Sequence, residues 1–150
     1  MAIGYRLDKP LGLTLVVWDG DITGEEAEGH ARRLLADPEW PPGPLHLLDA
    51  TSATSVPITA DTKLVDIVAG AAKTRQIRFA LVEHHGFTQA VNFERAASDR
   101  GVSRVIVFNA LIGACGWLGL DLAVIGPIID ELRRDLRAAH GPRPGPSSED

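Results

Sequence analysis

Residues 13–50 read "LTLVVWDGDITGEEAEGHARRLLADPEWPPGPLHLLDA" and contain a strand, a helix and a second strand in succession. The first segment, 13–20, is apolar on both faces near its end, which is typical of a strand deep in a sheet. Thr23 and Glu26 have the spacing of a capping box, in which each side chain satisfies a backbone N–H group of the other residue. Four prolines and a glycine within 37–44 then end the helix.

A third strand, 44–50, follows this helix, and a strand also precedes the unit. Residues 3–8, "IGYRLD", alternate apolar and polar side chains as a half-exposed strand does. The connection from 3–8 to 13–20 is short, so these two strands are expected to form an antiparallel hairpin.

Helices and strands continue to alternate along the rest of the chain. The predicted elements are a helix over 60–73, a strand over 77–83, a helix over 87–99, a strand over 102–108 and a short helix ending around 117–119. Asn109 is expected to cap the short helix. The sequence therefore predicts an α/β fold with a mixed, mostly parallel five-stranded sheet, an N-terminal antiparallel hairpin and covering helices.

The carboxyl-terminal part differs in character. Pro127 suits the first position of a helix over 127–139, and "PRPGPSSED" at the end is typical of a disordered tail over 140–150. The helix carries an apolar stripe of Ile128, Ile129, Leu132 and Leu136. This stripe packs on its own domain, contacts a partner or a second copy, or lies on a membrane surface. We expect a domain over 1–120 and an accessory helix within 121–139.

The composition narrows the classes of partner. The chain has 150 residues and a formal net charge of −5, so nucleic acid is not an expected partner. The longest nearly uncharged run, 105–129, is broken by glycines and a proline, which argues against a membrane span. The single cysteine, Cys115, lies in an apolar setting and is expected to be a buried structural thiol in a reduced, cytoplasmic compartment. No secretory leader is expected either.

Residues 48–62, "LDATSATSVPITADT", join a strand to a helix and are rich in hydroxyl groups. One interpretation is a polar connection in which Asp49, Thr51, Ser52 and Thr54 satisfy turn backbone and cap the next helix. The others are a ligand cradle and a phosphorylated switch.

Polar residues follow the carboxyl ends of several predicted strands. They are Asp19, Asp49, Glu83, His84, His85 and Asn109. In a mostly parallel sheet these ends share one edge, where crevices form and helices begin with unpaired N–H groups. The candidate ligand-binding residues are Asp49, Thr51, Ser52, His84, His85 and Asn109, and the ligand classes are an anionic metabolite or a polar head group.

The sequence gives little support for a catalytic or a metal-binding site. Neighbouring His84 and His85 on an extended chain point in opposite directions, and a zinc site needs two further ligands. The glycines of 113–119 do not match a dinucleotide fingerprint, and no nucleophile-elbow motif occurs. We therefore expect no catalytic residue, no metal and no cofactor. Trp40, among prolines, is either a packing residue or the rim of a pocket.

The order of elements resembles that of STAS domains, and more closely the SpoIIAA-like, STAS/Sec14-type small bacterial proteins. The residues that carry the likeness are "LVVWDGDITGEEAEGHARRLLADPEWPPGPLHLLDATSATSVPIT" (15–59) and "RVIVFNALIGACGWLGL" (104–120). The likeness covers roughly 1–120. Where relatives commonly begin the fourth helix with acidic residues, this chain has uncharged "NALIGACG", so the extra carboxyl-terminal helix is expected to cover that surface.

The resemblance implies a function in binding. Anti-sigma-factor antagonists of the STAS class carry a phosphorylated serine in D-S-S-G, whereas this chain has Ala60 or Asp61 near that position. Thr59 and Thr62 are the chemically possible phosphoacceptors. The likeness to lipid-exchange domains implies that the ligand could also carry an apolar tail. The leading expectation is a non-enzymatic module that binds a protein partner or itself as a homo-oligomer, and the alternative is a carrier or sensor of a small lipid or anionic metabolite.

Overall fold

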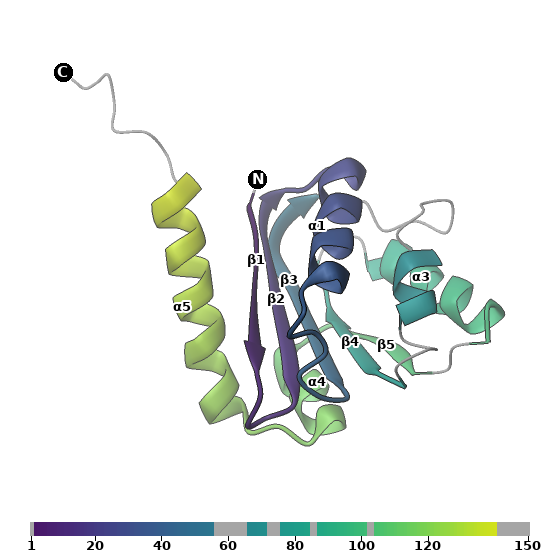
Figure 1. Cartoon of the computed structure of the whole chain (residues 1–150). Coiled ribbons are helices and arrows are strands. Elements are labelled where there is room, and N and C mark those ends of the chain that lie inside the picture. Colours follow the sequence, from purple (N-terminus) through teal and green to yellow (C-terminus); the bar gives the residue numbers. More distant parts are fainter. Residues whose placement is uncertain (1, 56–65, 72–75, 85–86, 102–103, 141–150) are drawn as a thin grey trace.

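The structure, a computed structural model, describes residues 2–55, 66–71, 76–84, 87–101 and 104–140 (Figure 1). Its elements in chain order are β1 (Ala2–Asp8), β2 (Leu13–Asp21), α1 (Gly24–Ala36), β3 (Leu45–Ser55), β4 (Arg78–Val82), α3 (Phe87–Asp99), β5 (Val105–Phe108), α4 (Leu111–Leu118) and α5 (Leu122–His140). Residues 66–71, between β3 and β4, are also helical.

The five strands form one sheet in the order β1-β2-β3-β4-β5. β1 pairs with β2 in the antiparallel sense, and the other three pairings are parallel. The predicted mixed sheet with an opening hairpin is therefore confirmed.

The capping box at the start of α1 is present as predicted. The Thr23 hydroxyl accepts the N–H of Glu26 at 3.1 Å, and the Glu26 carboxylate accepts the N–H of Thr23 at 2.8 Å. α1 ends at Ala36, directly before the proline-rich segment. Local sequence signals thus set both ends of this helix.

One face of the sheet is covered by α1, the helical residues 66–71 and α3. Trp18, Phe79 and Phe93 are buried in the core on this side, together with Ala69. Successive right-handed crossovers between strands added in one direction place their helices on the same face. The other face therefore needs a different cover.

α4 and α5 supply that cover, and α5 lies alongside β1 in Figure 1. The second core contains Leu15 and Leu47 from the sheet and Cys115 from α4. Ile129 and Leu136 of the α5 stripe are buried in it, and Ile128 and Leu132 pack against it while partly exposed. The four residues predicted as a possible interface thus pack on their own sheet, which is the first of the three predicted arrangements. α5 packs beside α4 on this face, but Asn109, Ile112 and Gly113 at the start of α4 stay exposed, so the predicted covering of that surface is wrong there.

The predicted loop after residue 50 is wrong over its first part, because β3 continues to Ser55. β2 extends to Asp21 and pairs with this part of β3, with Asp19 opposite Ser52 and Asp21 opposite Ser55. Two register shifts in β2 accommodate the longer pairing. Thr51 and Ser52 are strand residues rather than turn or cap residues.

Two predicted helix starts are wrong as well. The N-cap of α4 is Ala110 rather than Asn109, and no side chain caps the helix. Pro127 lies inside α5, because the helix begins at Leu122. The Asp121 carboxylate accepts the N–H of Ala123 at 2.9 Å, which caps the helix more than one turn before the proline.

Candidate functional site

A cleft with a volume of about 340 Å³ opens at the carboxyl end of β4, beside Asp49 within β3, and is also lined by α4 and α5. It is lined by Asp49, Thr51, His84, Ala110, Leu111, Gly126, Ile129, Asp130 and Arg133. The cleft lies where the carboxyl ends of parallel strands and the start of a helix meet, which is the usual place for ligands in sheets of this kind.

Asp49 is the buried carboxylate of the cleft, with 3% of its surface exposed. Its Oδ1 atom accepts the backbone N–H of Thr51 at 2.9 Å and the Thr51 hydroxyl at 2.6 Å. A buried charge is stable only when it is hydrogen-bonded or paired. Thr51 supplies the hydrogen bonds, and α5 supplies the opposite charge.

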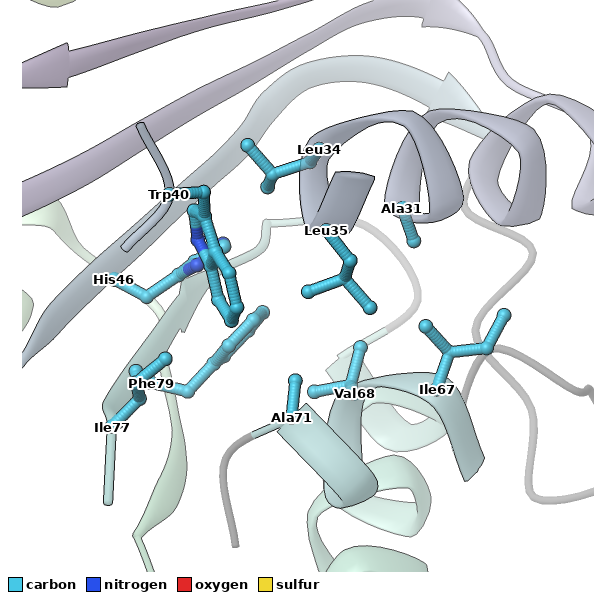
Figure 2. Close-up of a pocket in the computed structure, with 10 residues that line it drawn as sticks. All are labelled: Ala31, Leu34, Leu35, Trp40, His46, Ile67, Val68, Ala71, Ile77 and Phe79. Atoms are coloured by element: carbon cyan, nitrogen blue, oxygen red, sulfur yellow. The ribbon is translucent and has the colours of Figure 1, made fainter. Parts of the chain in front are cut away.

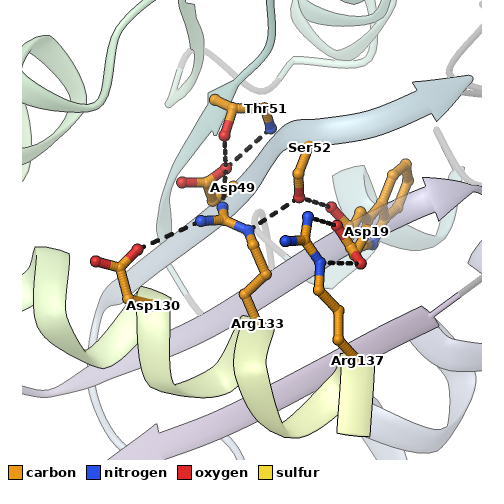
Figure 3. Close-up of polar contacts among 8 residues, drawn as sticks. Asp19, Asp49, Thr51, Ser52, Asp130, Arg133 and Arg137 are labelled. Atoms are coloured by element: carbon orange, nitrogen blue, oxygen red, sulfur yellow. Dashed lines mark hydrogen bonds and ion pairs between the residues drawn. The ribbon is translucent and has the colours of Figure 1, made fainter. Parts of the chain in front are cut away.

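Arg133 of α5 provides that charge. Its Nη2 atom lies 3.5 Å from Asp49 Oδ1, its Nη1 atom lies 3.4 Å from Asp130 Oδ1, and its Nε atom donates to Ser52 Oγ at 3.0 Å. Figure 3 shows the guanidinium between the helix and the strand ends. The two carboxylate contacts are longer than the 2.7–2.9 Å of strong charge-assisted hydrogen bonds, so the guanidinium keeps donor capacity for a closer anionic oxygen.

Arg137, one turn further along α5, holds a second strand end. Its Nε and Nη2 atoms donate to the two oxygens of Asp19 at 3.0 and 2.8 Å (Figure 3). These hydrogen bonds hold the pKa of the Asp19 carboxyl below its ordinary value, while burial opposes the shift and a hydrogen bond with Ser52 adds to it. Ser52 therefore touches both arginine sites and joins them into one network.

The amino end of α4 forms another wall, through Ala110 and Leu111. Because the alanine cap has no polar side chain, the N–H groups of the first turn lack the side-chain acceptor that Thr23 gives α1. The positive end of the helix dipole lies at the same place. The cleft thus combines a buried carboxylate with a guanidinium and an uncapped helix start.

Only some of the predicted ligand-binding residues lie at the cleft. Asp49, Thr51 and His84 line the cleft together, and Ser52 contacts its arginine. Asn109 is exposed and does not line the cleft among the described residues. His85 and the two predicted phosphoacceptors, Thr59 and Thr62, lie outside the described residues.

Sequence reasoning missed the contribution of α5. Arg133 and Arg137 reach Asp49, Ser52 and Asp19 on the strands, and Asp130 pairs with Arg133. The available signal is their spacing: residues three and four apart share one side of a helix, and these polar residues run beside the apolar stripe. A polar row that borders a buried stripe can reach across the rim of the contact, as the half-buried Arg133 does.

Within the described ranges, no group of three or more His, Cys, Asp or Glu side chains is placed to hold a metal ion. In the same part of the chain, no helix has the length and apolar character needed to cross a bilayer.

No protein-family model matches the chain, and a comparison with curated proteins found no match. Among solved structures, the chain is similar to an uncharacterized protein of the DUF3478 family with a SpoIIAA-like fold from Shewanella loihica PV-4. The two share 19% sequence identity with a TM-score of 0.47, over 78% of this chain and 92% of the other. The fold named for that protein is the one that the sequence resemblance indicated. The likeness concerns the course of the chain alone.

Proposed function

We propose that the protein binds a small anionic metabolite in the cleft and acts as its sensor or carrier. The observation that supports this most is the position of Arg133, whose guanidinium lines a cleft of about 340 Å³ with its carboxylate contacts at 3.4 and 3.5 Å. A carboxylate or phosphate oxygen at shorter range would gain a stronger charge-assisted hydrogen bond. The uncapped first turn of α4 favours the same sign of charge.

The two carboxylates beside Arg133 give the ligand a second requirement. The carboxylates of Asp49 and Asp130 accept hydrogen bonds and repel a second negative charge nearby. A ligand with one anionic group and a hydroxyl or amino group satisfies both the guanidinium and the carboxylates. A hydroxy acid or an amino acid has this pattern, whereas a dianion without donors does not.

Native mass spectrometry of the freshly purified protein tests retention of a cellular ligand. Calorimetric titration with lactate and with inorganic phosphate tests the site directly. Arg133→Gln should weaken binding roughly 10- to 100-fold, which is the usual worth of a hydrogen bond to a charged group. Arg134→Gln, on the same helix, is the matched control because Arg134 is exposed and makes no ion pair among the described residues.

Unchanged affinity in Arg133→Gln would remove the cleft as the anion site. Equal loss in both variants would show a general charge effect instead.

A protein partner or a second copy is the second candidate. Ile112 of α4 is 66% exposed, and Leu122 and Val124 at the start of α5 are also large exposed apolar residues. Size-exclusion chromatography with light scattering tests self-association, with Ile112→Ser and Val124→Ser in one variant. A monomer at every concentration, unchanged by the double substitution, would argue against a homo-oligomer through this surface.

A further inference from the structure

The charged groups that line the cleft do not balance one another. Asp49 and Asp130 each carry a carboxylate, and Arg133 carries one guanidinium, so apart from His84 the lining has a net charge of −1. The positive end of the α4 dipole offsets only about half a charge. A ligand that brings a negative charge alone would add to this excess, so a complementary ligand also carries a positive group.

Asp49 has an acceptor position for such a group. Its hydrogen bonds all reach the Oδ1 atom, two from Thr51 and one from Arg133. The Oδ2 atom has no hydrogen-bond partner among the described residues, although only 4% of the side chain is exposed. A carboxylate oxygen in such a buried side chain normally has a partner, and a charged donor gives the strongest bond. The side chain lines the cleft, so this position is open to a ligand there.

The two charges that a ligand would contact lie side by side. Arg133 Nη2 is 3.5 Å from Asp49 Oδ1, and Arg133 Nη1 is 3.4 Å from Asp130 Oδ1 (Figure 3). The ammonium and the carboxylate of an α-amino acid are attached to the same carbon atom, so they are adjacent as well. Placed against the Arg133–Asp49 pair in the opposite sense, they complete a ring of four alternating charges. Neither a hydroxy acid nor a simple amine provides this arrangement.

The rest of the lining is small and apolar. Ala110 and Leu111 at the start of α4 and Ile129 of α5 lie there. Gly126 leaves open space beside them, because a Cβ atom at this position would meet nothing within 4 Å. The side chain of a bound amino acid would lie against these residues. Burial of an apolar side chain is favourable at such a surface, whereas a charged side chain would find no opposite charge on these four residues.

The cavities on the opposite face of the sheet are too small for a ligand of this kind. Two of them adjoin one another between α1 and the strands, with a volume of about 40 Å³ each, and Figure 2 shows the one that Trp40 lines. A cavity needs about 10–15 Å³ to hold one water, so these have room for a few waters at most. Trp40, predicted as either a packing residue or a pocket rim, is buried in the core beside them.

We propose that the ligand of the cleft is a zwitterionic α-amino acid with an apolar side chain. This inference rests on the proposed function and narrows it, because a hydroxy acid would satisfy Arg133 but leave the excess negative charge in place. The ligand carboxylate accepts hydrogen bonds from the Arg133 guanidinium, and the ligand ammonium donates to Asp49 Oδ2. The ligand side chain lies against Leu111 and Ile129.

Alanine, lactate and alaninamide are the matched probes for calorimetric titration of the whole chain. Lactate has a hydroxyl in place of the ammonium of alanine, and alaninamide has an uncharged amide in place of the carboxylate. Alanine should bind roughly 10- to 100-fold more tightly than either, which is the usual worth of a hydrogen bond to a charged group. Valine should bind more tightly than threonine, which has nearly the same shape but carries a hydroxyl in place of one methyl group.

Three variants test the carboxylates. Asp49→Asn keeps the shape of the side chain and removes its charge, so the preference for alanine over lactate should fall below roughly threefold. Asp130→Asn provides a second test if Asp49→Asn does not fold, and it should lower the preference by roughly two- to fivefold because that side chain is 64% exposed. Glu131→Gln is the control, because Glu131 pairs with Arg6 outside the cleft lining, and it should bind as the wild type does. Thermal unfolding reports whether each variant folds.

The outcomes separate this inference from the proposed function. Lactate binding as tight as that of alanine would overturn the amino acid and leave the anion cleft in place. Equal affinity for alanine and alaninamide would overturn it in favour of a cation site. Full preference for alanine in folded Asp49→Asn, or tighter binding of threonine than of valine, would also contradict it. Absence of binding by every probe at millimolar concentration would remove the proposed function as well.

Discussion

Arg137 of α5 holds Asp19, near the end of β2, through two hydrogen bonds of 3.0 and 2.8 Å to the two carboxylate oxygens. The residues are 118 positions apart, so the pair fixes the far half of α5 against the sheet. Arg133 makes the corresponding link to Asp49 one turn earlier. The last helix is therefore aligned by charge as well as by its apolar stripe.

Arg137→Gln should raise the pKa of the Asp19 carboxyl toward its ordinary value of 3.8. Because the folded-state pKa is lowered, the stabilisation from this pair is present above pH 3.8 and is lost as the pH falls through the lowered value. Arg137 is 58% exposed, so the free energy of unfolding should fall by only about 0.2–1 kcal/mol at neutral pH. Carbon-13 NMR titration of the carboxyl groups measures the pKa. Arg134→Gln should leave it unchanged, and an unshifted Asp19 in Arg137→Gln would contradict the assignment.

His46 should make the protein less stable in mild acid. Burial lowers the folded-state pKa to about 3 from 6.5, so below pH 6.5 the unfolded chain binds a proton that the folded chain does not. The free energy of unfolding should then fall by about 1.4 kcal/mol per pH unit from this group. His46→Leu should flatten that dependence between pH 6.5 and 4, as measured by urea unfolding. His30 titrates in both proteins and does not obscure the difference. Equal slopes would contradict the prediction.

Gly4 and Leu136 should show strong coupling in stability. A Cβ atom at Gly4 would lie 3.0 Å from Leu136 Cδ2 and 3.3 Å from its Cγ, which is tighter than most real contacts. Gly4→Val should therefore destabilise by about 1–3 kcal/mol through overpacking, and Leu136→Ala by about 2–5 kcal/mol through a cavity. The double variant should lose less than the sum of the two, because valine fills part of the space. Additive losses in chemical denaturation would show that α5 does not contact β1 in this way.

Cys115 should react slowly with a disulfide reagent in the native protein. The thiol is 2% exposed, and burial, with smaller contributions from Asp49 and Asp121, raises its pKa. The thiolate is the reactive form, so modification requires α4 to open. Absorbance assays at pH 8 should show a rate roughly 100-fold lower than in denaturant. Fast modification of the native protein would show that α4 does not cover this residue.

The fold was predictable because its signals are local. The Thr23 capping box, the proline-rich segment after Ala36 and the apolar strands each act over a few residues. The error over β3 occurred where distant pairing outweighs local preference. β3 continues past residue 50 because Asp19 to Asp21 extend β2 beside it. No local pattern in the hydroxyl-rich stretch indicates that it pairs with β2.

The candidate site was predictable in part for the same reason. The rule that strand ends share an edge brought Asp49, Thr51 and His84 to one place, and the structure groups them. The contribution of Arg133 could not be predicted in this way. Arg133 lies on α5, and the position of α5 depends on which face of the sheet is left uncovered. That face follows from the handedness of all preceding crossovers, so it is a property of the completed topology.

The late position of α5 has a consequence for synthesis on the ribosome. The strands that carry Leu15 and Leu47 emerge first, and their second apolar surface stays uncovered until residues 122–140 leave the exit tunnel. Nascent chains that stall before that point expose the apolar face of the sheet, and chaperones recognise intermediates of this kind. Premature stop codons upstream of α5 should accordingly yield insoluble product, even though every strand has already been made.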